Sequence, residues 1–162
     1  MERFGPDKKS FIHQVVEEYS DMIFRIAYQN LRSKADAEDI TQDVFLRLMQ
    51  EPEFEKMEYL KAWLIRVAVN RCRDHRKSAW FRKTEPLEEI GIADGDPEQS
   101  VWSELWKLPA ADRTVVYLHY YEGYSIREIA KILDQKENTV GSRLTRARKK
   151  LKDILLEGGY SL

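Results

Sequence analysis

The sequence has few of the residues that build covalent or metal-centred sites. It contains one cysteine, Cys72, which excludes an internal disulfide and a cysteine-cluster metal site. Its three histidines lie far apart and lack the spacing of metal ligands. No apolar run approaches the roughly 20 residues that cross a bilayer, and no apolar stretch typical of a secretory signal follows the N-terminus. We therefore expect a cytoplasmic protein without cofactor, metal or membrane insertion.

The 162 residues, 43% hydrophobic and 34% charged, are enough for one domain or two small ones. Apolar residues at helical spacing predict a helix over residues 8–30, a second helix capped by Ser33 and ended by Pro52, and a third from about Leu60. The predicted buried positions are Phe11, Ile12, Val15, Val16, Tyr19, Met22, Ile23, Ile26, Ile40, Val44, Phe45, Leu48, Leu64, Val67, Ala68 and Cys72. No strand pattern is present, so we predict an all-α fold.

A break in composition predicts two domains. Residues 84–97 contain two prolines, two glycines and several acidic side chains, without hydrophobic periodicity, which is typical of a linker. We therefore predict a first helical domain over residues 1–83 and a second over residues 98–162. The second domain's expected apolar positions before its last two helices are Val101, Trp102, Leu105, Trp106, Val115, Val116 and Leu118, with Pro109 opening a helix.

The last 40 residues have the pattern of a helix-turn-helix. Ser125 and Glu128 fit a capping box, and Asp134 interrupts the apolar spacing of the helix that follows. Either Asn138 or Thr139 can start the next helix. The apolar faces of the two helices are predicted to be Ile126, Ile129, Ala130 and Leu133, then Val140, Leu144, Ala147 and Leu151. The second helix would point outward Ser142, Arg143, Thr145, Arg146, Arg148, Lys149 and Lys150, a set suited to a DNA major groove.

The net charge of −1 conceals two basic blocks. Residues 61–84 carry 8 basic and 1 acidic side chains, giving +7, and residues 113–162 carry 10 and 6, giving +4. Between them, residues 85–112 carry 1 basic and 8 acidic side chains, giving −7. Two basic blocks separated by an acidic one favour contact with nucleic acid at two places.

The first basic block also contains aromatic residues. Trp63 lies within it, and Trp80 and Phe81 follow it. Cations interleaved with rings and amides suit single-stranded or locally melted nucleic acid. Three structural explanations remain open: Trp63 can belong to the core, Trp80 and Phe81 can pack against the linker, and Asn70 can bond Asp74 or a neighbouring helix.

Three segments, in this order, resemble those of extracytoplasmic-function sigma factors, minimal sigma-70-type initiation factors of bacterial RNA polymerase. DAEDITQDVFLRLM, from Asp36 to Met49, is similar to the family's polymerase-binding helix. KAWLIRVAVNRCRDHRK, residues 61–77, is similar to the helix that opens and reads the −10 element. LPAADRTVVYLHYYEGYSIREIAKIL with NTVGSRLTRARKKL is similar to the domain that reads the −35 element. The resemblance covers nearly the whole chain.

The resemblance implies three partners, namely core RNA polymerase, promoter DNA and an anti-sigma factor, and neither enzymatic activity nor a small-molecule substrate. It implies polymerase contacts by Asp39, Gln42, Asp43 and Phe45. The residues expected at the −10 region are Asn70, Arg66, Arg73, Arg76 and Lys77. Those expected at the −35 region are Arg127, Thr139, Ser142, Arg143, Arg146, Lys149 and Lys150. Two positions depart from the family: Asp43 replaces a more common Glu, and Gly141 stands where relatives often carry Lys or Arg.

Three other functions remain possible on the sequence alone. A stand-alone helix-turn-helix regulator would need only the last domain, leaving the patterns of residues 36–49 and 61–77 unexplained. An enzyme acting on nucleic acid would need clustered carboxylates, but the acidic residues near Asp39 fit a helix start and a partner surface better. A family member kept only for protein–protein interaction is hinted at by Gly141 alone.

Overall fold

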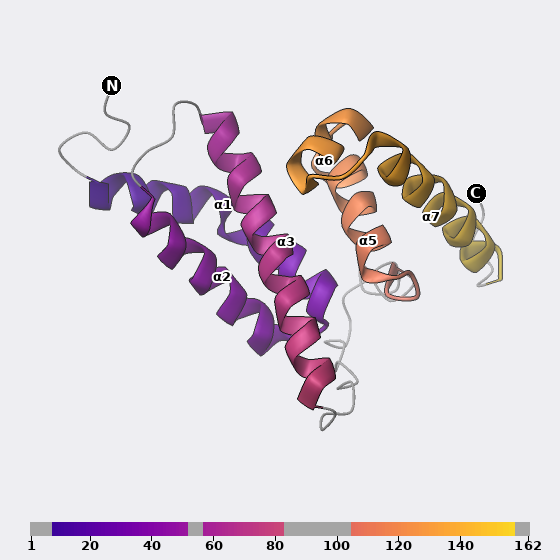
Figure 1. The fold of residues 1–162 in the computed structure, drawn as a ribbon, viewed down its shortest axis with the longest axis horizontal. Coiled ribbons are helices and arrows are strands. Elements are labelled where there is room, and N and C mark those ends of the chain that lie inside the picture. Colours follow the sequence, from indigo (N-terminus) through magenta and orange to yellow (C-terminus); the bar gives the residue numbers. More distant parts are fainter. Residues whose placement is uncertain (1–7, 52–56, 83–104, 158–162) are drawn as a thin grey trace. The chain divides into compact units, whose positions relative to one another are not determined.

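The computed structural model of the protein describes residues 8–51, 57–82 and 105–157, and every regular element within these ranges is helical (Figure 1). The predicted all-α fold is therefore confirmed. The chain divides into two compact units, Met1–Glu88 and Glu89–Leu162. The predicted linker, residues 84–97, and the expected core positions Val101 and Trp102 lie outside the described residues.

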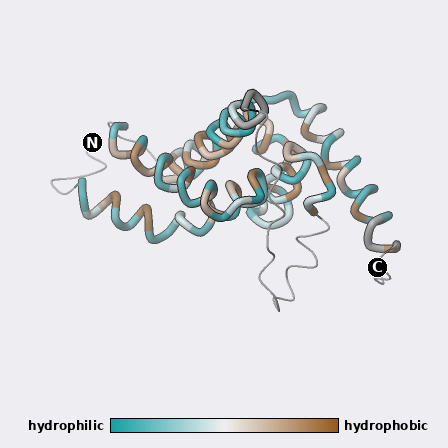
Figure 2. Tube along the Cα trace, turned by 90° about the horizontal axis from the view of Figure 1, so that it is seen from below, coloured by the Kyte–Doolittle hydropathy of each residue, from teal (hydrophilic) through white to brown (hydrophobic). Residues whose placement is uncertain are grey.

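Three helices form the described part of the first unit. Helix α1 spans Lys8–Leu31, α2 spans Lys34–Gln50 and α3 spans Met57–Arg82, and each helix contacts the other two. Apolar and polar residues alternate along these helices with the period of a buried stripe (Figure 2). The largest fully buried apolar side chains of this core are Ile23, Ile26, Leu48, Leu60, Leu64 and Ile65.

The predicted core positions of α2 and α3 are all buried. On α1 the prediction was partly right: Val15, Met22, Ile23 and Ile26 are buried, whereas Phe11, Ile12, Val16 and Tyr19 are only half-buried. Cys72 is fully buried, and burial raises the pKa of its thiol to about 12. The thiolate is the reactive form of cysteine, so Cys72 serves packing rather than chemistry.

Polar contacts fix the ends of α2. The Ser33 hydroxyl accepts a hydrogen bond of 3.2 Å from the Asp36 amide, as the sequence predicted for a cap. At the other end, Lys8 Nζ donates to the carbonyls of Met49, at 2.9 Å, and Glu51, at 3.3 Å. A cation here suits the negative end of the helix dipole and also joins α1 to α2.

The described helices of the second unit are α5 at Ala110–Val116, the π-helical turn η1 at Tyr117–Tyr121, α6 at Ile126–Leu133 and α7 at Glu137–Glu157. Helix α7 packs against both α5 and α6. The buried apolar side chains of this unit are Trp106, Leu108, Val115, Val116, Tyr117, Leu118, Ile129, Ala130, Ile132, Val140, Leu144 and Ala147.

The structure corrects several helix details. Helix α3 begins at Met57, not near Leu60, and α7 begins at Glu137, one residue before the first predicted start. An acidic side chain in each first turn, Glu58 in α3 and Glu137 in α7, suits the positive end of the helix dipole. On α6, Ile132 is buried although it was not predicted to be.

Candidate functional site

The outward side of α2 contains part of the predicted polymerase-binding set. Asp39 and Gln42 are exposed. Asp43 is half-buried, and its carboxylate pairs with Arg71 of α3 at 2.5 Å and with Arg47 at 3.9 Å. Phe45 is only 8% exposed and packs in the core. Asp39 and Gln42 are therefore available to a partner. Asp43 is engaged in ion pairs, and Phe45 packs α2 against the core.

Two residues of this surface were missed from the sequence. Leu46 is 58% exposed and Met49 is 54% exposed. With Asp39 and Gln42 they are spaced by three, four and three residues, so the four side chains lie on one helical face, here called the α2 outer stripe. The spacing of the four residues was visible in the sequence. Leu46 and Met49 were missed because apolar residues in a helix are usually expected to face its core.

The predicted −10 residues on α3 fall into two groups. Arg66, Arg73 and Lys77 are exposed, and Asn70 is half-buried. Arg73 Nη2 donates a hydrogen bond of 3.0 Å to Asn70 Oδ1, so a cation and an amide one turn apart form one polar group. Asp74 was one predicted partner of Asn70, but the structure places Arg73 there instead.

Arg76 has a different environment from the other arginines of α3. Its Nη1 donates a hydrogen bond of 2.8 Å to Asn30 Oδ1 of α1, and Asn30 in turn donates to the carbonyl of Ile26 at 2.8 Å. Burial lowers the pKa of Arg76, and the neighbouring Cys72 opposes that shift. Arg76 thus joins α3 to α1, and its guanidinium has a partner inside the unit.

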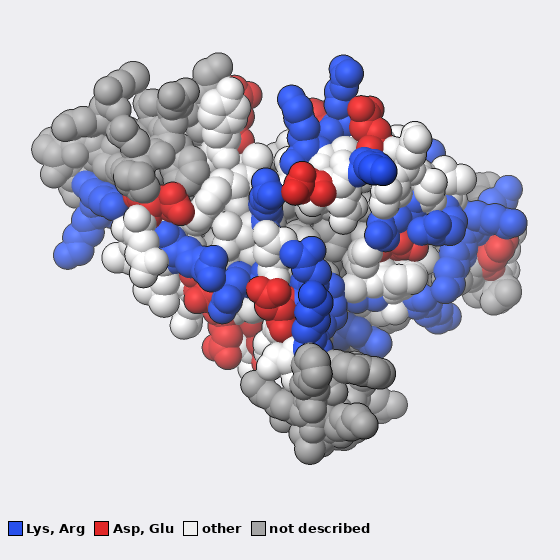
Figure 3. Space-filling model, in the orientation of Figure 1, with Lys and Arg blue, Asp and Glu red and all other residues white. Residues whose placement is uncertain are grey.

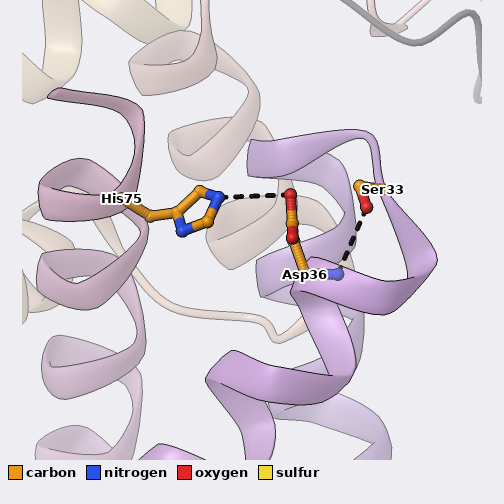
Figure 4. A network of polar contacts seen from close by, with 3 residues as sticks. All are labelled: Ser33, Asp36 and His75. Atoms are coloured by element: carbon orange, nitrogen blue, oxygen red, sulfur yellow. Dashed lines mark hydrogen bonds and ion pairs between the residues drawn. The ribbon is translucent and has the colours of Figure 1, made fainter. Parts of the chain in front are cut away.

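A second polar contact joins α3 to the start of α2. Figure 4 shows the His75 ring directed toward the Asp36 carboxylate, while the Asp36 backbone nitrogen faces the capping hydroxyl of Ser33. The distance from His75 Nε2 to Asp36 Oδ2 is 3.1 Å. Asp36 therefore takes part in both the helix cap and the contact with His75, which orients α3 relative to α2.

The helix-turn-helix has the predicted geometry at its first helix. The Ser125 hydroxyl accepts from the Glu128 amide at 3.1 Å, and Glu128 Oε1 accepts from the Ser125 amide at 2.9 Å. These bonds to Ser125 lower the pKa of the Glu128 carboxyl. Helix α6 ends at Leu133, its C-cap residue Asp134 has a left-handed φ of 54°, and the chain enters α7 after three residues.

The outward face of α7 is polar and basic, and Lys and Arg side chains gather over it in Figure 3. Ser142, Arg146, Lys149 and Lys150 are exposed, and Thr139 is half-buried. A shallow hollow of about 290 Å³ is lined by Asn138, Thr139, Ser142, Arg143 and Arg146. Short polar groups and guanidinium forks around one concavity suit a base edge or a phosphate.

Arg143 was predicted to point outward, but only 26% of its side chain is exposed. Arg143 Nη1 lies 3.8 Å from Asp112 Oδ1 of α5, and Arg146 Nη2 lies 3.9 Å from the same oxygen. Arg146 remains 65% exposed. The role of Asp112 could not be predicted from the sequence, because its partners lie roughly 30 residues further along the chain. Arg127, the remaining predicted residue, is exposed and pairs with Glu137 at 4.0 Å.

Gly141 is helical and not required by packing. A Cβ added at this position would meet nothing within 4 Å. The space beside Gly141 is therefore open for a larger side chain.

The described part of the chain has neither a helix long and apolar enough to cross a membrane nor a group of three or more His, Cys, Asp or Glu that could hold a metal ion. The polar surfaces of α2, α3 and α7 are thus the features that remain to be explained.

Known proteins share the sequence patterns of both units. The Sigma-70 region 2 family matches residues 15–82, and the Sigma-70 region 4 family matches residues 98–151. The chain is 34% identical over 169 residues to the ECF RNA polymerase sigma factor SigL of Mycobacterium tuberculosis, covering 94% of this chain and 93% of SigL. It is 31% identical over 162 residues to the ECF RNA polymerase sigma factor SigW of Bacillus subtilis, covering 87% of each chain.

Solved structures give the same result. The sigma factor RpoE of Bartonella quintana, in complex with the anti-sigma factor NepR, matches with a TM-score of 0.74 and 25% identity, over 91% of this chain and 97% of RpoE. CnrH, in complex with the cytosolic domain of CnrY, matches with a TM-score of 0.63 and 26% identity, over 89% of this chain and 86% of CnrH. On the extent and identity of these matches, the chain belongs to the ECF RNA polymerase sigma factors.

Proposed function

We propose that this protein directs bacterial core RNA polymerase to specific promoters and helps to open them. The observation that carries the proposal is the order of the family matches, region 2 over α1–α3 and region 4 over α5–α7, with a polar or basic surface on each. The protein then acts in the cytoplasm by binding, with no catalytic step of its own.

The domain roles follow from the surfaces. Residues 1–83 bind polymerase and contact the −10 region, and residues 98–162 contact the −35 region. Residues 84–97 connect these two domains. The α2 outer stripe suits a protein partner, because exposed Leu46 and Met49 offer apolar area beside the polar Asp39 and Gln42. The exposed cations of α3 and α7 suit phosphates.

The test is transcription in vitro with core polymerase, followed by mapping of the start sites. We expect weak promoter binding by the protein alone and specific initiation with core polymerase. Equal sequence-specific footprints with and without polymerase would instead identify a stand-alone helix-turn-helix regulator. Cleavage or modification of DNA by the protein alone would identify an enzyme.

The docking surface can be tested separately. Asp39→Ala with Gln42→Ala, and Leu46→Ala independently, should weaken binding to core polymerase and leave the helix content unchanged, because all three side chains are exposed. Glu18→Ala, an exposed acidic position on α1, is the matched control and should bind normally. Unaltered affinity in both stripe variants would remove α2 from the docking assignment.

An anti-sigma factor is a further proposed partner, supported by the similarity to a sigma factor solved with one. Co-purification with the product of an adjacent gene that encodes a membrane protein with a small cytoplasmic domain, and loss of transcription when that domain is added, would identify it. Unchanged transcription at saturating concentrations of the domain would exclude that candidate.

A further inference from the structure

A buried carboxylate lies behind the DNA-facing surface of α7. Only 8% of the Asp112 side chain is exposed, and its Oδ1 is within 3.9 Å of both the Arg143 and the Arg146 guanidinium groups. Both distances exceed those of ordinary hydrogen bonds, so attraction between charges holds the group together. Among the described residues, Arg143 and Arg146 are the two side chains that pair with Asp112.

The two arginines are placed differently by this carboxylate. Arg143, with a quarter of its side chain exposed, is held between α5 and α7 and forms part of the hollow's wall. Arg146 is mostly exposed and reaches solvent from the same carboxylate. Asp112 thus holds both guanidinium groups in place before DNA binds.

We propose that Asp112 is a specificity-determining positioning residue for duplex recognition by α7. The inference rests on the proposed function of α7 in reading the −35 region. It goes beyond that function because Asp112 itself lies on α5 and is too buried to contact DNA.

Two physical effects of Asp112 act in the same direction. An arginine already held in place loses less side-chain entropy when it contacts a base, which strengthens the specific complex. A negative charge behind two arginines also reduces the attraction that any DNA sequence exerts through its phosphates. Specific binding is therefore favoured and sequence-independent binding is weakened, so their ratio rises.

The experiment uses the holoenzyme of core polymerase with the full-length protein. A promoter found by start-site mapping is randomised at its −35 element, and transcripts from the library give the preference of each variant. Affinity for a promoter-free duplex is measured over a range of salt concentrations. Asp112→Asn, which keeps the shape and removes the charge, should lower the ratio of best to poorest sequences by about two- to tenfold, the range for losing one pre-ordered side chain. Its affinity for the promoter-free duplex should rise, with a salt slope steeper by about 1.

Asp153→Asn is the matched control, because it removes an exposed negative charge from α7 that does not pair with Arg143 or Arg146. It should raise affinity for all sequences and leave the −35 preference unchanged. Asp112→Glu is the second variant, since it keeps the charge and moves it by one methylene. It should lower the preference without changing the salt slope.

The outcomes separate this proposal from the function on which it rests. A wild-type holoenzyme without −35 preference would contradict the proposed function of α7. A wild-type preference that survives in both Asp112 variants would overturn the role of Asp112 alone. A lower melting temperature with an unchanged preference ratio would show that Asp112 only stabilises the fold.

Discussion

In α3, two arginines reach side chains of neighbouring helices and are half-buried, whereas most cations on the outward face of α7 are exposed, even where they contact a side chain as Arg146 and Arg148 do. Arg71 pairs with Asp43 and Arg76 with Asn30, while the exposed Arg73 bonds to Asn70 of its own helix. On α7, Lys149 and Lys150 are exposed, and only Arg143 is largely withdrawn. The difference follows from packing, because α3 contacts both α1 and α2 and places several of its cations beside their polar groups.

This comparison shows that positive charge on a helix can serve two purposes. A guanidinium that bonds across helices stabilises the unit and orients its neighbours, while an exposed ammonium is available to phosphates. Substitutions of Arg71 or Arg76 should therefore change stability, whereas substitutions of exposed cations on α3 and α7 should change DNA binding alone.

Arg76→Ala should have the largest effect on stability. It removes the charged donor that Arg76 supplies to the buried amide oxygen of Asn30, at a cost of about 2 kcal/mol in the free energy of unfolding. Denaturant unfolding of the full-length protein measures this change. The neighbouring exposed Lys77→Ala should stay within about 0.5 kcal/mol of wild type. If Arg76→Ala leaves stability unchanged but loses DNA binding, Arg76 contacts DNA rather than stabilising the unit.

Asn70→Ala tests whether the Asn70–Arg73 group acts on DNA. An amide can bond the edge of an unpaired base, so its removal should reduce open-complex formation about fivefold, which corresponds to one hydrogen bond of about 1 kcal/mol. A template melted in advance over the −10 region should restore only part of the loss, because the base contact is still absent.

Arg73→Ala is the companion variant, and low salt should rescue it more fully because its proposed partner is a phosphate. A different result for Asn70→Ala would be a lower melting temperature of the protein and an equal reduction of open-complex formation on the duplex and the pre-melted template. In that case Asn70 is a structural residue of the three-helix unit.

Gly141 offers a test in the opposite direction, since its added Cβ meets nothing. Gly141→Ala should stabilise the protein by about 0.5–1 kcal/mol, because glycine is a poor helix former. Gly141→Lys should also raise affinity for DNA and steepen its salt dependence. Thermal unfolding and salt titration measure the two effects. A destabilised alanine variant would mean that Gly141 has a conformational role that its helical backbone does not show.

Lys150→Ala should have the smallest effect. Its side chain is exposed near the end of the basic run, so affinity should fall alike for all sequences, with a salt slope lower by about 1 and stability unchanged.

Arg143→Ala is the contrasting variant and should relax the preference at one −35 position by roughly 1–3 kcal/mol. If both variants lose affinity with no change in preference, α7 binds DNA only through its charge.

The sequence by itself determined most of the local structure of this protein. The caps at Ser33 and Ser125 and the buried stripes of α2 and α3 were predicted correctly, because each depends on residues within one or two turns. The resemblance of three ordered segments also identified the family, and the matches to both units confirm it.

Tertiary structure alone decided which charged and apolar side chains remain available. Asn30 and Arg76 are 46 residues apart, and Asp112 meets Arg143 only because α5 packs on α7. Helical periodicity predicts the side on which a residue lies, but the partner it meets there is set by the neighbouring helix.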